Sequence, residues 1–483
     1  MNPSSTDQTA VYLGTQPVEP IQPWPIAVTN PAGGTLIKEL VGGGKLDTIR
    51  AVDEASRSME AWESKSSAER SRTLHNIAST LRGDAVQAQL STLISQETGK
   101  RISEAQAELN LSAAFFDWFG DAIASRHGET WEIVPGISHE VRHQAIGVVG
   151  VITPWNFPVS IPARKIAAAL AAGCAVVFKP SEVAPLSSLS FAEIVASHLS
   201  QGVLCTIVGE PASVAEVLTG DPRVRAITFT GSTRVGQLIA RDAAANMKRA
   251  VLELGGSAPF IVLDDVDIDE SVATLMVAKY RNNGQSCIAA NHAWVPQHLY
   301  GDFVEAFIKA SEDLVIGDPL DQNTTLGPLA LPSDPLRLAE LIRGAEADRA
   351  TVVHTHAEEL PSGNFVSPAV CLSPSPTAQI VSEEIFGPVL SILPYSNVDC
   401  VIEALQSLRY GLSGYISTND IERAKRLASR LDIGIIGVNT ATPNTPQIPF
   451  SGRKFSGIGT EGGMLGLDEF LSHQTIAYSQ SRQ

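Results

Sequence analysis

Basic residues are scarce in this chain relative to acidic ones, and long apolar runs are missing. Lysine and arginine number 35 against 52 aspartate and glutamate residues, which gives a formal net charge of −17 at pH 7. A net acidic surface repels nucleic acid and anionic membranes, so neither is expected as a partner. The longest apolar run, residues 166–178, is shorter than the ~20 residues that a transmembrane helix needs, and it predicts a buried core segment.

Paired cysteines are also missing. The five cysteines (174, 205, 287, 371 and 400) are odd in number and form no C-x-x-C pair, so a disulfide framework is not expected. The histidines are scattered, and the nearest two, His354 and His356, fit a strand face or a loop, so no metal site is predicted. The first ten residues lack the basic and apolar regions of a secretory signal. Together with reduced thiols, this favours a cytoplasmic protein.

Buried strands alternate with helices over most of the chain. Residues 1–25 are rich in Pro, Gln, Ser and Thr and are expected to run loosely over the surface. Helical periodicity then covers about 46–125. Further on, apolar strands such as "CAVVFKPS" alternate with helices such as "ARKIAAALAAG". This order predicts βαβ units, and therefore an α/β fold with parallel sheets covered on both faces.

Two segments look like exposed strands. Residues 131–144 alternate like a two-stranded ribbon, and 473–480 ("HQTIAYSQ") resemble one more strand. Exposed strands are liabilities unless something pairs with them. Solvated edges are one interpretation. Pairing between subunits is the interpretation that we favour.

Two predicted strand ends carry groups that suit a dinucleotide. In "FTGSTRVG" (229–236), Ser232 and its flanking glycines stand at the start of a helix, where free N–H groups and the helix dipole favour a pyrophosphate. The G-x-x-x-x-G spacing lacks the Lys–Ser/Thr of a P-loop. In "FKPSE" (178–182), Lys179 and Glu182 suit the two hydroxyls of a ribose. A plain strand–turn–helix and a surface ion pair are the respective alternatives.

A thiol, an acid and an amide form a possible reactive set. If Cys287, Glu253 and Asn156 converge, the thiolate can attack a carbonyl carbon. The amide, with a backbone N–H, can hold the oxyanion, and the carboxylate can activate water against the thioester. An inert buried cysteine and a solvated glutamate are the alternatives, and spacing alone does not separate the two interpretations.

Seven motifs in order resemble the aldehyde dehydrogenase superfamily over roughly residues 25–475. They are "ITPWNFP", "FKPSE", "FTGSTRVG", "LELGG", "NNGQSC", "EEIFGPV" and "PFSGRKFSGIGTEGG". The resemblance implies a Rossmann-like cofactor domain (20–124 and 145–254), an α/β catalytic domain (255–455) and an oligomerisation element (125–144 and 456–483). It also implies NAD-dependent oxidation of a small aldehyde in a homodimer or homotetramer.

The resemblance assigns roles to matching positions. Cys287 matches the nucleophile, Asn156 the oxyanion amide and Glu253 the base that activates water. The matching cofactor contacts are Trp155, Lys179, Ser181, Glu182, Gly231, Ser232, Gly236, Glu384 and Phe386. Among these, Glu182 is expected to repel a 2′-phosphate, which favours NAD over NADP.

Within the superfamily, succinate semialdehyde dehydrogenases are the most similar. They carry arginines at the positions of Arg164 and Arg281, which there hold the distal carboxylate of the substrate, a bidentate task that suits guanidinium. Asn444 and Thr445 stand where that subfamily often has a serine contact. Ala289 and Ser257 replace residues common in relatives. An ω-oxo acid such as succinate or glutarate semialdehyde is therefore expected.

Several alternatives remain open. The arginines can be structural ion pairs, which would leave an uncharged aliphatic or aromatic aldehyde as substrate. "FFDWF" (115–119) can line a tunnel for such a substrate or form a buried helix face. A thiol esterase that needs no nicotinamide and a non-catalytic NAD-binding protein are rival classes. The first leaves the cofactor motifs without a purpose, and the second leaves the intact Cys287, Glu253 and Asn156 unexplained.

Overall fold

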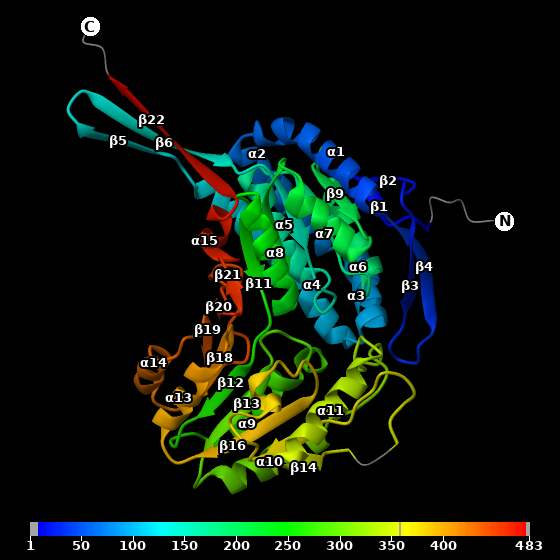
Figure 1. The fold of residues 1–483 in the computed structure, drawn as a ribbon, viewed down its shortest axis with the longest axis vertical. Coiled ribbons are helices and arrows are strands. Elements are labelled where there is room, and N and C mark those ends of the chain that lie inside the picture. Colours follow the sequence, from blue (N-terminus) through cyan, green and yellow to red (C-terminus); the bar gives the residue numbers. More distant parts are fainter. Residues whose placement is uncertain (1–7, 357–358, 480–483) are drawn as a thin grey trace, which may run out of the picture.

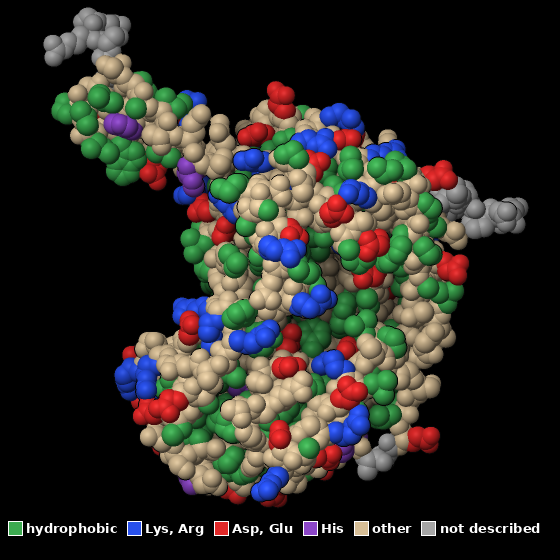
Figure 2. Space-filling model, viewed as in Figure 1, with side chains coloured by type: hydrophobic (Ala, Val, Ile, Leu, Met, Phe, Trp, Pro, Cys, Tyr) green, Lys and Arg blue, Asp and Glu red, His purple; other side chains and the backbone are tan. Residues whose placement is uncertain are grey.

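The computed structural model describes residues 8–356 and 359–479. Figure 1 shows two α/β parts, one above the other, and a narrow β-ribbon that projects from the upper part. Figure 2 shows that the surface is hollowed where the two parts meet. None of the described helices is long and apolar enough to span a membrane.

The upper part is built on an eight-stranded sheet of order β2-β1-β9-β8-β7-β10-β11-β21. Its five central strands run parallel, and antiparallel strands close both edges. The parallel strands and the βαβ pattern predicted for this region are therefore confirmed. The strands are β1 (Val11–Leu13), β2 (Gln16–Pro17), β7 (Val148–Ile152), β8 (Val176–Lys179), β9 (Leu204–Ile207), β10 (Val224–Thr230), β11 (Arg249–Glu253) and β21 (Gly457–Ile458).

Eight helices accompany this sheet. The run 166–178 falls in α5, β8 and the turn between them, and all residues of α5 are buried, as the apolar run predicts. Its neighbours α2 and α4 supply much of the surrounding core. The helices are α1 (Lys45–Glu63), α2 (Ser67–Leu81), α3 (Asp84–Thr98), α4 (Ile102–Ser125), α5 (Ser160–Ala172), α6 (Pro185–Ser197), α7 (Pro211–Gly220) and α8 (Thr233–Ala245).

The lower part holds a seven-stranded sheet of order β14-β15-β16-β13-β12-β18-β19, in which only the β14–β15 pair is antiparallel among the described strands. Separate apolar clusters cover its two faces. Its elements are β12 (Ala258–Val262), α9 (Ile268–Tyr280), β13 (Ala290–Pro296), α10 (Tyr300–Glu312), α11 (Asp334–Ala347), β14 (Thr351–His354), β15 (Ala369–Leu372), α12 (Gln379–Ser382), β16 (Val389–Tyr395), α13 (Val398–Ser407), β18 (Ser413–Ser417), α14 (Ile421–Ala428) and β19 (Ile435–Val438).

The projecting ribbon confirms the predicted exposed strands. β5 (Glu129–Val134) and β6 (Ile137–Ala145) form a hairpin, and β22 (Leu471–Ser479) pairs with β6 along its whole length. Trp131 and Ile133 remain exposed on it. The assignment of this sheet to subunit contacts stays a prediction, which the mass of the intact protein in solution would test. The last predicted residue of the tail strand, 480, lies outside the described residues.

The expectation of a loose N-terminal segment is wrong for the part that the structure describes. β1 adds to the edge of the upper sheet through β9, and Ala10 and Val11 are fully buried. The apolar side chains of "AVYL" are buried against the sheet, although residues 1–25 as a whole have a polar composition. A second hairpin follows, β3 (Trp24–Thr29) with β4 (Leu36–Gly42).

The predicted tail element also contributes to the upper sheet. β21 pairs with β11 and closes that edge, although residues 456–483 were assigned to oligomerisation as a block. Short elements surround it: β17 (Tyr410–Gly411), β20 (Arg453–Lys454) and α15 (Gly463–Asp468). The domain boundaries otherwise stay a prediction.

Candidate active site

The predicted site residues collect at the junction of the two sheets. Asn156 follows β7, Lys179 ends β8, Ser232 follows β10 and Glu253 ends β11, all at the carboxyl edge of the upper sheet. From the lower part, Cys287 precedes β13 and Glu384 precedes β16. Because parallel strands present their carboxyl ends at one edge, residues far apart in the sequence meet there.

The loop that carries Cys287 has an unusual backbone. Asn282 and Asn283 adopt left-handed conformations with φ of 55° and 57°, and Gly284 follows at 75°. Asparagine tolerates this region better than most residues because its short side chain bonds to nearby backbone. Here the Asn283 amide donates to the carbonyls of Gly99 (2.9 Å) and Pro328 (3.0 Å). These contacts hold a strained loop in place at the candidate nucleophile.

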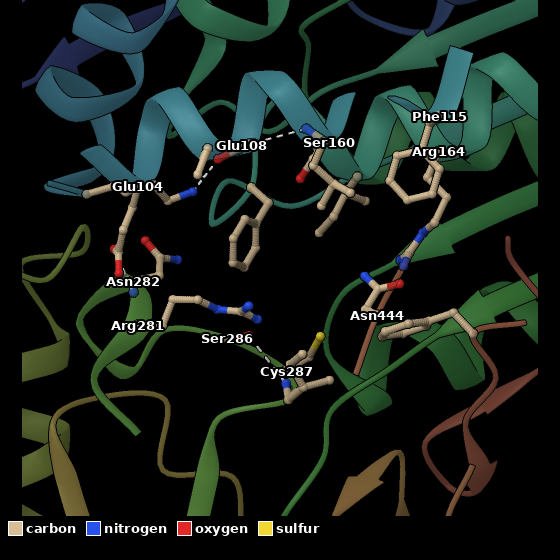
Figure 3. A pocket seen from close by; sticks show the side chains of 17 residues that line it. Glu104, Glu108, Phe115, Ser160, Arg164, Arg281, Asn282, Ser286, Cys287 and Asn444 are labelled. Carbon is tan, nitrogen blue, oxygen red and sulfur yellow. Dashed lines mark hydrogen bonds and ion pairs between the residues drawn. The ribbon is translucent and has the colours of Figure 1, made fainter. Parts of the chain in front are cut away.

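Cys287 lines a pocket of about 160 Å³ that lies between α4, α5 and this loop (Figure 3). Burial, and then the nearby carboxylates of Glu384 and Glu253, raise the pKa of the thiol to about 12. The resting group is therefore a thiol rather than a thiolate. Cys174, Cys205 and Cys371 are buried, and Cys400 is exposed. None of these four lines the pocket that holds Cys287.

Asn156 is buried, and its amide is oriented by the nucleophile loop. Its Nδ2 donates to the Gln285 carbonyl at 3.0 Å, and Asn282 Nδ2 donates to the Asn156 carbonyl, also at 3.0 Å. One N–H of the Asn156 amide thus remains for another acceptor, because an amide nitrogen carries two hydrogens. The geometry suits an oxyanion donor.

Glu253 is buried with no hydrogen-bond partner for either carboxylate oxygen in the described part of the chain. Burial, followed by the charge of Glu461, raises its pKa well above the usual value for glutamate. A carboxylate with a raised pKa is a stronger base toward water than an ordinary glutamate. Its unpaired oxygens are the kind of buried polar atoms that indicate a functional group rather than a structural one.

A charged cluster beside Glu253 was not predicted. Glu461 Oε2 forms an ion pair with Arg164 Nε at 2.5 Å, and its Oε1 contacts the ammonium of Lys165. Lys165 also donates to Thr228 at 3.0 Å. These two cations, after the opposing effect of burial, lower the pKa of Glu461. In the sequence, only the glutamate within "GTEGG" indicated this cluster. Its partners lie almost 300 residues earlier in the chain, so the pairing could not be predicted.

The groups predicted to bind the adenosine half lie at the ends of β8 and β10, and their binding role stays a prediction. Lys179 Nζ and Glu182 form an ion pair of 2.9 Å, and Ser181 accepts from the Val183 N–H at 3.2 Å. Ser232 caps α8 by accepting from the Val235 N–H at 3.4 Å. The first N–H groups of α8 therefore face the carboxyl edge of the sheet, which suits a pyrophosphate.

The two glycines of this turn have packing roles. Gly231 donates its N–H to the Glu253 carbonyl at 3.0 Å. A Cβ on Gly236 would lie 2.3 Å from the Leu254 side chain, so this glycine lets α8 approach β11. This close approach between helix and sheet accounts for a glycine at position 236. A direct contact with a cofactor stays a prediction.

The residues predicted to contact the nicotinamide end are Glu384, Trp155 and Phe386, and this role also stays a prediction. Glu384 is half-buried, and its buried Oε1 is unpaired in the described chain; desolvation raises the pKa of this carboxyl to about 7. The rings of Trp155 and Phe386 meet edge to face at 5.7 Å. Asn291, which was not predicted, fixes the Glu384 loop by bonding to the Glu383 carbonyl (2.5 Å) and the Ile385 N–H (3.1 Å).

The predicted substrate residues fall into three groups. Arg281 and Asn444 line the Cys287 pocket, and Arg281 extends into it (Figure 3). Arg164 also lines it, but its Nε is paired with Glu461 and its guanidinium stacks on Phe450 at 4.2 Å. Thr445 is exposed and does not line this pocket. Of the "FFDWF" segment, Phe115 lines the pocket, whereas Phe116 and Phe119 belong to the core.

The donor set does not suit a metal. The described residues contain no group of three or more His, Cys, Asp or Glu side chains that could hold an ion. The unpaired Glu384 oxygen, the Lys179–Glu182 pair and the start of α8 instead fit an elongated dinucleotide along the carboxyl edge of the upper sheet.

The fold and site define a two-part α/β oxidoreductase with one thiol at the junction of a cofactor-type sheet and a second sheet. The aldehyde dehydrogenase family model matches residues 19–476, and the chain belongs to the aldehyde dehydrogenase family. The recognition made from the seven motifs is thereby confirmed.

Named relatives and solved structures agree with this membership. Glutarate-semialdehyde dehydrogenase of Pseudomonas putida is 36% identical over 459 residues, 94% of each chain. Succinate-semialdehyde dehydrogenase [NADP(+)] of Escherichia coli is 36% identical over 92% of each chain. The crystal structure of succinate-semialdehyde dehydrogenase from Burkholderia pseudomallei superposes with a TM-score of 0.94 at 32% identity, covering 99% of this chain and 100% of that one.

Proposed function

We propose that this protein oxidises an aldehyde that carries a distal carboxylate, such as succinate or glutarate semialdehyde, with NAD as the hydride acceptor. The observation that carries the proposal is Arg281. Its guanidinium makes no ion pair or side-chain hydrogen bond with the residues described here, yet it points into the pocket that holds Cys287. A cation without a partner in a partly buried pocket suits an anionic ligand.

The reaction begins at the Cys287 sulfur. The thiol loses its proton to solvent water, and the sulfur forms a C–S bond to the aldehyde carbon as the C=O π bond opens to an oxyanion. The free N–H of Asn156 and the Cys287 backbone N–H stabilise this oxyanion. A nicotinamide held by the predicted cofactor residues would supply the hydride acceptor. Collapse of the oxyanion expels the hydride and leaves a thioester. Hydride loss therefore depends on prior attack by sulfur.

The thioester is then hydrolysed by water. Glu253 takes a proton from the water as its oxygen attacks the acyl carbon, the C–S bond breaks and the carboxylic acid leaves. Glu253 passes this proton to the departing Cys287 sulfur, which restores both the thiol and the carboxylate. The relatives that bear the names glutarate- and succinate-semialdehyde dehydrogenase support the ω-carboxylate substrate, as does the cationic wall of the pocket.

Replacing Arg281 with alanine is expected to raise KM for succinate semialdehyde by roughly ten- to a hundred-fold, because losing a charge-assisted contact costs about 1.5–3 kcal/mol. KM for butanal should change little. NADH formation with both aldehydes measures the difference. Arg164→Ala is the matched comparison: it should slow the oxidation of both aldehydes alike, because Glu461 loses one of its two cationic partners. If Arg281→Ala raises KM equally for the two aldehydes, Arg281 has a structural role and does not bind the substrate carboxylate.

The cofactor preference is tested at Glu182. Because this carboxylate repels a 2′-phosphate, kcat/KM should favour NAD over NADP by about ten-fold or more, and Glu182→Ser should narrow the ratio. Some relatives carry NADP(+) in their names. Equal turnover with NADP in the unmodified protein would mean that Lys179 holds the phosphate despite Glu182, and the NAD assignment would fall.

A further inference from the structure

A lysine outside every predicted motif connects the two halves of the reactive site. Lys100 follows Gly99, which ends α3, and precedes α4, and its side chain is fully buried. It forms an ion pair with Glu108 and donates to the Asn156 carbonyl at 2.9 Å. Buried lysines are rare unless they are paired, because an isolated ammonium is strongly disfavoured in a protein interior.

The same ion pair holds the far end of the oxyanion turn. Glu108 Oε1 accepts the N–H groups of Val159 at 2.9 Å and Ser160 at 3.0 Å, where α5 begins. Figure 3 shows Glu108 reaching from α4 to Ser160. Lys100 therefore fixes the start of the turn through a carbonyl, and Glu108 fixes its end through two N–H groups.

The nucleophile loop is attached to the same point. The Asn156 carbonyl that accepts from Lys100 also accepts from Asn282, and Asn282 donates to the Gln285 carbonyl at 2.9 Å as well. Gln285 in turn receives the Asn156 side-chain amide. The direction of the free Asn156 N–H relative to the Cys287 sulfur thus depends on where Lys100 holds the Asn156 backbone.

We propose that Lys100, through its ion pair with Glu108, is a positioning residue that aligns the Asn156 amide with the oxyanion formed at Cys287. This inference rests on the proposed function of Asn156. Lys100 lines the pocket, so a second explanation is that its charge attracts the carboxylate of the substrate. The two explanations differ for a neutral aldehyde, since only misalignment of the oxyanion donor slows an uncharged substrate.

The experiment compares single-turnover NADH bursts with succinate semialdehyde and butanal in Lys100→Met, in Lys100→Met/Glu108→Gln and in Asn156→Ala. The double variant removes the unpaired buried carboxylate and keeps an oxygen for Val159 and Ser160, so it guards against failure to fold. Both Lys100 variants should slow the burst by roughly ten- to a hundred-fold with either aldehyde, since displacements near 1 Å have effects of this size. The dissociation constant of NAD should stay within about two-fold.

Lys248→Met is the matched control. Lys248 is also buried and donates to a backbone carbonyl, that of Val224 at 2.6 Å, but it lies away from the pocket, before β11. It should lower the thermal midpoint and leave the burst unchanged.

Four results would overturn the proposal. The first is a normal NADH burst in both Lys100 variants while Asn156→Ala is slow, and the second is a slower burst with succinate semialdehyde alone. The third is a burst that Lys248→Met slows as much as the Lys100 variants do. The fourth is a rise in the dissociation constant of NAD large enough to explain the slower burst. A normal burst in Asn156→Ala would overturn the oxyanion assignment itself, and the Lys100 proposal with it.

Discussion

Replacing Cys287 with alanine is expected to lower aldehyde oxidation by about 10⁴-fold or more, because removal of a nucleophile abolishes covalent catalysis and leaves only binding and the oxyanion donors. Binding of NAD should remain, since Cys287 makes none of the contacts that fit the adenosine or pyrophosphate. Stopped-flow absorbance at 340 nm (the NADH band) measures the rate, and fluorescence titration measures the binding.

Cys400→Ala provides the control for this variant. Cys400 is exposed on α13 and is not among the pocket residues, so its loss should leave the rate unchanged. Residual oxidation by Cys287→Ala at more than about one per cent of the original rate would be incompatible with a covalent thioester. Such a result would indicate that the aldehyde is oxidised without a covalent bond to the protein.

Replacing Glu253 with glutamine is expected to separate the two halves of the reaction. The first hydride transfer should still occur and give a burst of NADH that matches the enzyme concentration. Turnover should then slow by roughly 10²- to 10⁴-fold, because the thioester has lost the base that activates water. Acylated enzyme should accumulate and appear as a mass increase of the intact protein.

The pH dependence follows from the raised pKa of Glu253. Burial keeps this carboxyl protonated further up the pH scale than an ordinary glutamate. Because only the ionised form accepts a proton from water, thioester hydrolysis should rise with pH through the range in which Glu253 titrates. The Glu253→Gln variant should lose this dependence. A steady-state rate equal to that of the unmodified protein would refute the assignment of Glu253 as the base.

The alternation of strands and helices could be predicted from the sequence because both patterns are local. Buried strands such as β8 and helices such as α5 were found with their approximate bounds. The N-terminal strand β1 was not predicted because its three residues are stabilised by pairing with β9, which is distant in the sequence. A short strand at a sheet edge carries almost no periodicity of its own.

The reactive set was identified from motifs, whereas its supporting residues were not. Cys287 and Asn156 lie in recognisable stretches. Lys100 and Glu461 are ordinary charged residues in the sequence, and nothing local separates a buried lysine from one in solvent. The ion pair between Arg164 and Glu461 joins α5 to the C-terminal region. It could be identified only from the folded structure. As a consequence the two arginines, both predicted to bind the substrate carboxylate, differ: Arg164 is held by a carboxylate, whereas Arg281 makes no ion pair with the described residues.

The freedom of Arg281 also bears on how this enzyme can change. Its side chain makes no polar contact that stabilises the described fold, whereas the neighbouring Asn282 and Asn283 side chains are bonded to backbone on both sides of the junction. Substitution of a residue without such contacts usually alters the folding free energy by less than about 0.5 kcal/mol. Selection can therefore exchange the preferred aldehyde at position 281 and leave the catalytic loop beside it intact.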